Sequence, residues 1–68
     1  MLFLIEYNRL RGEIASISTF NNDQREQADD ARLTLELQQH RLGRQLEVVM
    51  MEAEDETALR KTHARFFK

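Results

Sequence analysis

The sequence predicts a small α+β protein whose elements follow the order ββαβα. Three observations lead to this prediction: apolar and polar residues alternate with a period of two in the first two segments, the period becomes helical after residue 20, and two glycines separate segments. We expect a two-layer arrangement in which a three-stranded sheet, in the order 2-1-3, carries two packed helices. A chain of 68 residues has the length of one small domain, so residues 1–68 are expected to form a single domain.

The first two strands are predicted at residues 2–8 and 13–20, joined by a hairpin turn. In the first strand Phe3, Ile5 and Tyr7 share one face, while Leu2 and Leu4 share the other. Residues 8–12 form the turn, in which Asn8 and Gly12 are both candidates for a positive φ. The second strand contains serines and few large residues, which predicts a strand at the sheet edge. Its two faces are expected to be Ile14, Ser16, Ser18 and Phe20 on one side and Ala15, Ile17 and Thr19 on the other.

The second half of the chain predicts a long helix, a third strand and a last helix. The long helix spans residues 23–42, with Asp23 as its N-cap and Gly43 as the left-handed residue that ends it. The run of valines and methionines after Gly43 favours a buried strand at residues 45–53. Asp55 is the predicted N-cap of a last helix over residues 56–67.

The connections determine the expected strand order. A helix joins the second and third strands, so these two should run parallel to each other with a right-handed crossover. The first strand is apolar on both faces, which suits a central strand that pairs antiparallel with both neighbours.

The long helix is predicted to have two apolar faces of different size. At about 100° per residue, the face toward the sheet contains Ala28, Ala31, Leu35 and Leu42. Leu33, Leu37 and His40 point away from it and form what we call the outer strip. Two interpretations stay open for the outer strip: ordinary surface residues, or a contact site for another subunit.

The sheet raises a similar question, because the first and third strands are apolar on both faces. Two helices on one face would leave Leu, Val and Met side chains of the other face in water, which favours a homodimer that covers them. The alternative is that the two helices lie on opposite sides of the sheet. A chain this short also has little core of its own, and it has no cysteine for disulfides.

Composition argues against several function classes. The net charge of −2 is a weak argument against a dedicated nucleic-acid binder. The apolar opening MLFLI is followed at once by Glu6, and it is too short for a signal peptide or a membrane span. We therefore expect no membrane partner, and the lack of cysteine fits a cytoplasmic protein.

The C-terminal stretch LRKTHARFFK is the most basic part of the chain. On a helix, Leu59, Thr62, His63 and Phe66 share an apolar face, and Lys61, Arg65 and Lys68 lie opposite. The favoured interpretation is a core-facing side and a solvated basic side that complements the helix C-terminus. The alternative function is a nucleic-acid-binding module that uses the basic residues of this helix and of the hairpin loop: Arg9, Arg11, Lys61, Arg65 and Lys68.

No pattern in the sequence indicates catalysis or a cofactor. His40 and His63 match no zinc-binding spacing, and the acidic segment EAEDE at residues 52–56 lacks the alternating ligands and glycine of a calcium loop. There is neither a glycine-rich phosphate loop nor a nucleophile elbow. We therefore expect a non-enzymatic interaction protein without metal or cofactor, acting as a homodimer or as an accessory partner of another protein.

Overall fold

The structure is a computed structural model that describes residues 1–43 and 46–67. Its strands are β1 (Leu2–Asn8), β2 (Glu13–Phe20) and β3 (Leu46–Glu52), and its helices are α1 (Arg25–Leu42) and α2 (Glu56–Thr62). Short 3-10 turns, Asn22–Gln24 and Ala64–Phe66, precede α1 and follow α2. The α+β class and the ββαβα order are confirmed, and the predicted bounds of the first two strands match those observed.

The sheet has the predicted order β2-β1-β3, with β1 antiparallel to both neighbours. Because each outer strand is antiparallel to β1, β2 and β3 run parallel to each other. The pairing of β1 with β3 is regular over seven residues, from Leu2 opposite Glu52 to Asn8 opposite Leu46. The third strand was predicted at residues 45–53; it ends one residue earlier, at Glu52, and residue 45 lies outside the described residues.

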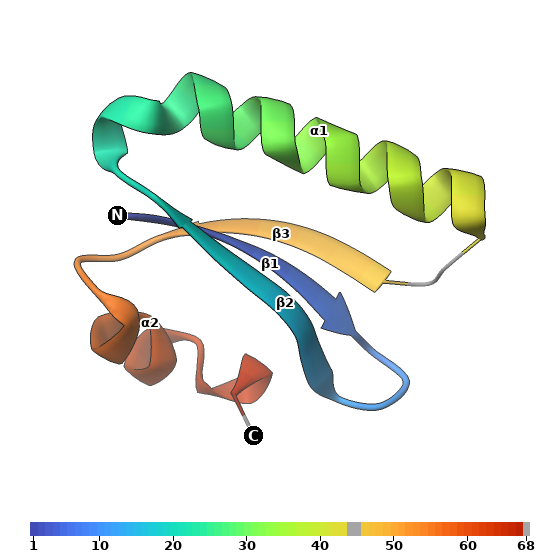
Figure 1. Cartoon of the computed structure of the whole chain (residues 1–68). Coiled ribbons are helices and arrows are strands. Elements are labelled where there is room, and N and C mark those ends of the chain that lie inside the picture. Colours follow the sequence, from blue (N-terminus) through green and yellow to red (C-terminus); the bar gives the residue numbers. More distant parts are fainter. Residues whose placement is uncertain (44–45, 68) are drawn as a thin grey trace.

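The two helices lie on opposite faces of the sheet, with α1 above it and α2 below it in Figure 1. The arrangement therefore has three layers rather than the two expected. The alternative interpretation, in which the two helices lie on opposite sides of the sheet, is the one observed. The physical reason is the two-sided apolar pattern of β1 and β3, because each face of such a sheet requires a cover. The premise of an uncovered sheet face, from which the homodimer was predicted, is thus overturned.

The face toward α2 carries the larger hydrophobic core. Its buried members are Phe3, Ile5, Met51, Leu59 and Phe66, and the partly buried residues around them are Tyr7, Ile14, Val49, Ala53 and Phe67. Side chains alternate along a strand, so Leu2 and Leu4 face α1, where Ala28 and Gln39 are also buried.

A β-bulge in β2 changes which face one isoleucine joins. Glu6 is opposite Ser16, but the next residue of β1, Tyr7, is opposite Ile14, so Ala15 is an extra residue. The bulge moves Ile14 to the α2 face, where it packs against the core. The prediction that Ile14 shares a face with Ser16, Ser18 and Phe20 was therefore wrong.

The ends of the elements follow local chemistry. Gly12 and Gly43 both have positive φ, 65° and 66°, as predicted, whereas Asn8 does not; its side-chain Oδ1 accepts the Arg11 N–H instead. Asp55 caps α2, because its Oδ1 accepts the Ala58 N–H at 2.8 Å. The N-terminal cap of the long helix is not Asp23: the chain turns at Asn21, whose N–H donates to Gln24 Oε1.

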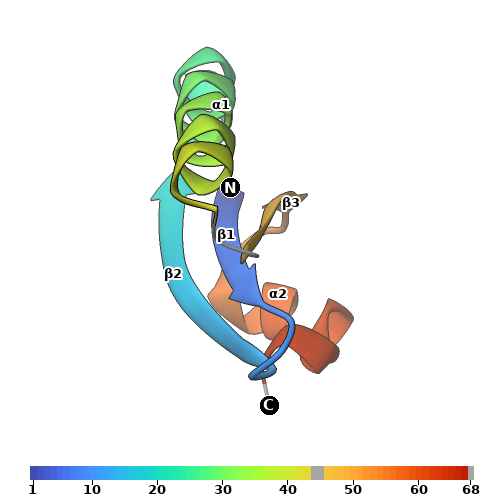
Figure 2. The same ribbon diagram turned by 90° about the vertical axis from the view of Figure 1, so that its right-hand side faces the viewer.

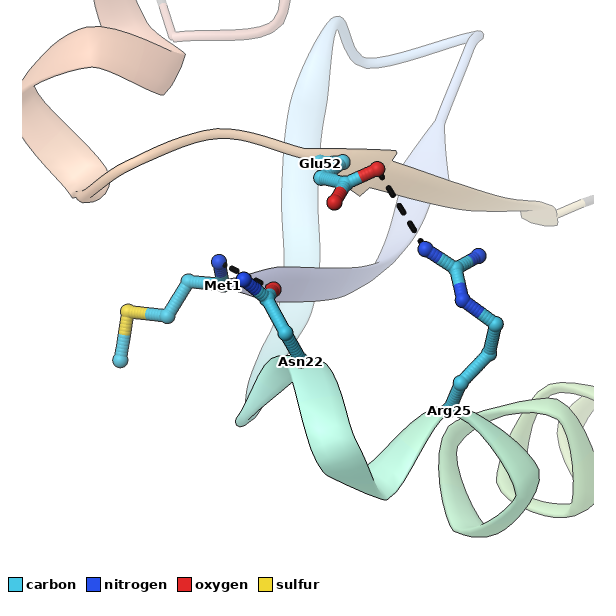
Figure 3. Close-up of polar contacts among 4 residues, drawn as sticks. All are labelled: Met1, Asn22, Arg25 and Glu52. Carbon is cyan, nitrogen blue, oxygen red and sulfur yellow. Dashed lines mark hydrogen bonds and ion pairs between the residues drawn. The ribbon is translucent and has the colours of Figure 1, made fainter.

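Two polar contacts fix the start of α1 beside the sheet. The amino group of Met1 lies 2.6 Å from Asn22 Oδ1, and Arg25 Nη2 lies 3.4 Å from Glu52 Oε2 (Figure 3). At its other end α1 extends past the start of β3 (Figure 1). Leu42, predicted to face the sheet, is consequently 61% exposed.

Candidate interaction surfaces

The outer strip lies where the helical periodicity placed it. Leu33 and Leu37 are each 55% exposed, and His40 is exposed as well. Arg32, beside the strip, lies 3.9 Å from Asp29 and 3.8 Å from Glu36. The structure therefore brings the three predicted residues together on one solvent-facing side of α1, and their role as a contact site stays a prediction.

The two outer strands present open edges. Among the described residues, β2 and β3 each pair only with β1, and Figure 2 shows them as the outer strands, with α1 above and α2 below. An edge strand carries backbone N–H and C=O groups that are ready to pair with another strand. Because helices cover both faces of this sheet, we expect another chain to contact the sheet mainly at its two edge strands.

The two edges differ in how well they are protected. Strand β2 contains the bulge at Ala15, which discourages pairing with another chain, and three small polar residues, Ser16, Ser18 and Thr19. Strand β3 has no bulge, proline or lysine, and its four central residues Val48–Met51 are all apolar. Val48, Val49 and Met50 are only partly buried, although their composition is typical of a central strand.

A groove at the hairpin end of the sheet brings together residues from distant parts of the sequence. Its volume is about 350 Å³, and its lining includes Tyr7, Arg9, Glu47, Arg65 and Phe66. The Tyr7 and Phe66 rings meet edge to face at 4.7 Å, and the Arg65 guanidinium lies over the Phe66 ring at 4.9 Å. The structure thus places Arg9 of the hairpin and Arg65 of the C-terminal turn on the lining of one groove.

The other predicted basic residues are less concentrated. Arg9 lies 3.7 Å from Glu47, and Arg11 lies 3.6 Å from Glu13, so acids offset the charge of both hairpin arginines. Lys61 is exposed on α2, and Lys68 lies outside the described residues. Of the four predicted residues within the described part of the chain, Arg9 and Arg65 are the two that line a common groove.

The apolar face of the C-terminal segment is mostly core, as expected. Leu59 and Phe66 are buried and His63 is partly buried. Thr62, predicted to share this face, is exposed, and its hydroxyl donates to the Ala58 carbonyl at 3.0 Å. The segment is a short helix followed by a 3-10 turn rather than one helix to residue 67, and Phe66 of this turn belongs to the core.

A buried polar cluster under α1 was not anticipated from the sequence. The Glu6 carboxylate accepts a hydrogen bond from Ser16 Oγ at 2.5 Å and another from Gln39 Nε2. Gln39 is only 6% exposed, and its Oε1 has no hydrogen-bond partner among residues 1–43 and 46–67. The sequence signal for this cluster was Glu6, an acid in the middle of an apolar strand, because a half-buried carboxylate needs hydrogen-bond donors.

The chain was compared with known proteins, and no family model, curated protein or solved structure matches it. Among the described residues, no group of three or more His, Cys, Asp or Glu side chains is arranged to hold a metal ion. No helix in this part of the chain has the length and apolar character needed to cross a membrane.

Proposed function

We propose that this chain is a small non-enzymatic interaction protein of the cytoplasm, which works as a homodimer or as the accessory partner of another protein. The observation that carries the proposal is the sheet with a helix on each face and two open edges. Main-chain hydrogen bonds at such an edge give affinity for an added strand, and neighbouring side chains give specificity. The outer strip, Leu33, Leu37 and His40, is the second contact surface we propose.

Site-specific photo-cross-linking in cells tests this proposal. A photoreactive residue would replace Val49 on the β3 edge or Leu37 in the outer strip, and Gln27, an exposed position elsewhere on α1, provides the control. We expect a discrete cross-linked species from Val49 or Leu37 and none from Gln27. The absence of any discrete species at both test positions would contradict an interaction function.

Nucleic-acid binding is the second candidate, and the groove shared by Arg9 and Arg65 favours it. Two guanidinium groups in one concave site offer a contact for phosphates, although Glu47 in the same groove opposes it. The test is titration with a single-stranded oligonucleotide at about 50 mM salt, where phosphate contacts are strong. This candidate predicts weaker binding for Arg65→Gln than for Arg11→Gln, and unshifted amide resonances throughout the titration would dismiss it.

A further inference from the structure

The composition of β3 conflicts with its position at the edge of the sheet. Its centre is apolar on both faces, with Val48 and Met50 toward α1 and Val49 and Met51 toward α2. Strands with this two-sided pattern are usually internal to a sheet. Yet Val48, Val49 and Met50 keep part of their surface in solvent, and β3 has no pairing partner beyond β1 in the described structure.

We propose that β3 pairs with β3 of a second copy of this chain, antiparallel and centred on Val49, to form a continuous six-stranded sheet. This inference rests on the proposed interaction function and specifies its partner and its surface. The order of strands would be β2-β1-β3-β3-β1-β2, so that β3 becomes internal and the bulged β2 strands form the new edges.

Hydrogen-bonding geometry restricts the register. Along an edge strand, the N–H and C=O groups of alternate residues point outward, and in an antiparallel pair outward-pointing residues must face each other. The paired residue numbers must therefore differ by an even number, which places one residue of each copy on the two-fold axis. With Val49 on the axis, all seven residues from Leu46 to Glu52 find a partner, whereas an axis at Val48 or Met50 shortens the overlap.

The Val49 register also avoids repulsion between like charges. Glu47 lies opposite Met51 of the other copy, and Glu52 lies opposite Leu46, so no two acids face each other. Val48 meets Met50 and Val49 meets itself, which gives apolar cross-strand pairs on both faces of the sheet. Opposed residues point to the same face, so the two α1 helices share one side of the extended sheet and the two α2 helices share the other.

Oxidative cross-linking of single-cysteine variants tests both the pairing and its register, because the natural chain contains no cysteine. Two chains that both carry Val49→Cys are expected to form a disulfide with each other. A chain that carries Val48→Cys is expected to link to a chain that carries Met50→Cys when the two variants are mixed. One of these two pairs is a hydrogen-bonded pair of the antiparallel ladder, and the other is a non-hydrogen-bonded pair. Side chains lie closer together in a non-hydrogen-bonded pair, so one of the two pairs has the short Cβ–Cβ distance that a disulfide requires. Ile17→Cys on the β2 edge is the matched control, for which we expect no linkage.

Light scattering on the unmodified chain over a concentration series completes the test, and it does not depend on the folding of a variant. The expected result is a mass that approaches twice that of one chain as the concentration rises. A single-chain mass at every concentration, or linkage through Ile17→Cys in place of the β3 variants, would overturn the inference. The proposed interaction function would survive that result if cells still yield a discrete cross-linked species with a different protein.

Discussion

At the residue scale, the contact of Glu6 with Gln39 determines how α1 is seated on the sheet. A half-buried carboxylate such as that of Glu6 needs hydrogen-bond donors, and the structure supplies them from Ser16 of β2 and Gln39 of α1. One cluster thereby links two strands and a helix. Within the described part of the chain the buried Oε1 of Gln39 accepts no hydrogen bond, so this arrangement carries a cost as well as a benefit.

The first prediction concerns this pair. Gln39→Met keeps the side-chain length but removes the donor to a charged partner, so we expect a loss of about 1.5–3 kcal/mol in the free energy of unfolding. Combining it with Glu6→Met should recover much of that loss, because replacing both partners of a buried hydrogen bond by apolar groups is close to neutral. Urea unfolding with an unchanged slope measures both changes. A double variant less stable than either single variant would show that the cluster is not the source of the effect.

At the element scale, the bulge at Ala15 allows β2 to place Ile14, Ile17 and Thr19 on the α2 face. Deletion of Ala15 leaves Tyr7 opposite Ile14 and Glu6 opposite Ser16, so every side chain keeps its face. Deletion of Ser18 is also absorbed by the bulge, but it moves residues 15–17 to the opposite faces, so that Ile17 turns toward α1 and Ser16 turns away from Glu6. The two deletions are matched in size and differ only in their effect on register.

We therefore predict that deletion of Ala15 changes stability by less than about 1 kcal/mol, whereas deletion of Ser18 costs at least about 2 kcal/mol, because Ile17 leaves the α2 face and the Glu6 carboxylate loses the hydrogen bond from Ser16. Chemical unfolding compares the two variants directly. The Ala15 deletion should also aggregate more readily, because a straightened edge strand has lost its protection. Equal destabilisation by both deletions would mean that register on β2 has little influence on stability.

The elements also show which features the sequence could predict. The bounds of the first two strands, the positive φ of Gly12 and Gly43 and the Asp55 cap depend on local spacing, and each was predicted from a few neighbouring residues. The bulge depends on how β2 pairs with β1. The groove that Arg9 and Arg65 share depends on where the C-terminal segment packs against the sheet. The sequence also left open what covers the second apolar face of the sheet, because a helix of the same chain and a second copy of the chain both satisfy that pattern.

At the scale of the whole molecule, the two faces of the sheet are covered by separate parts of the chain. The face that carries Phe3 and Ile5 is closed by Leu59 of α2 and by Phe66 of the C-terminal turn. The opposite face is closed by α1, whose buried residues are Ala28 and Gln39. A protein this small has little stability to spare, so the C-terminal turn is expected to be as necessary to folding as α1.

The last prediction tests that expectation. Phe66 is buried and contacts Tyr7 edge to face, so Phe66→Ala should cost about 3–5 kcal/mol. That loss is comparable to the total stability of a marginal domain, about 5 kcal/mol, so a large part of the population should be unfolded without denaturant. Leu37→Ala on the exposed side of α1 is the control and should stay within about 0.5 kcal/mol of the unmodified chain when measured at concentrations too low for association. Circular dichroism during urea unfolding separates the two outcomes. If Phe66→Ala unfolded cooperatively at the same midpoint as the control, the C-terminal turn would be an appendage, and the sheet would be held by α1 alone.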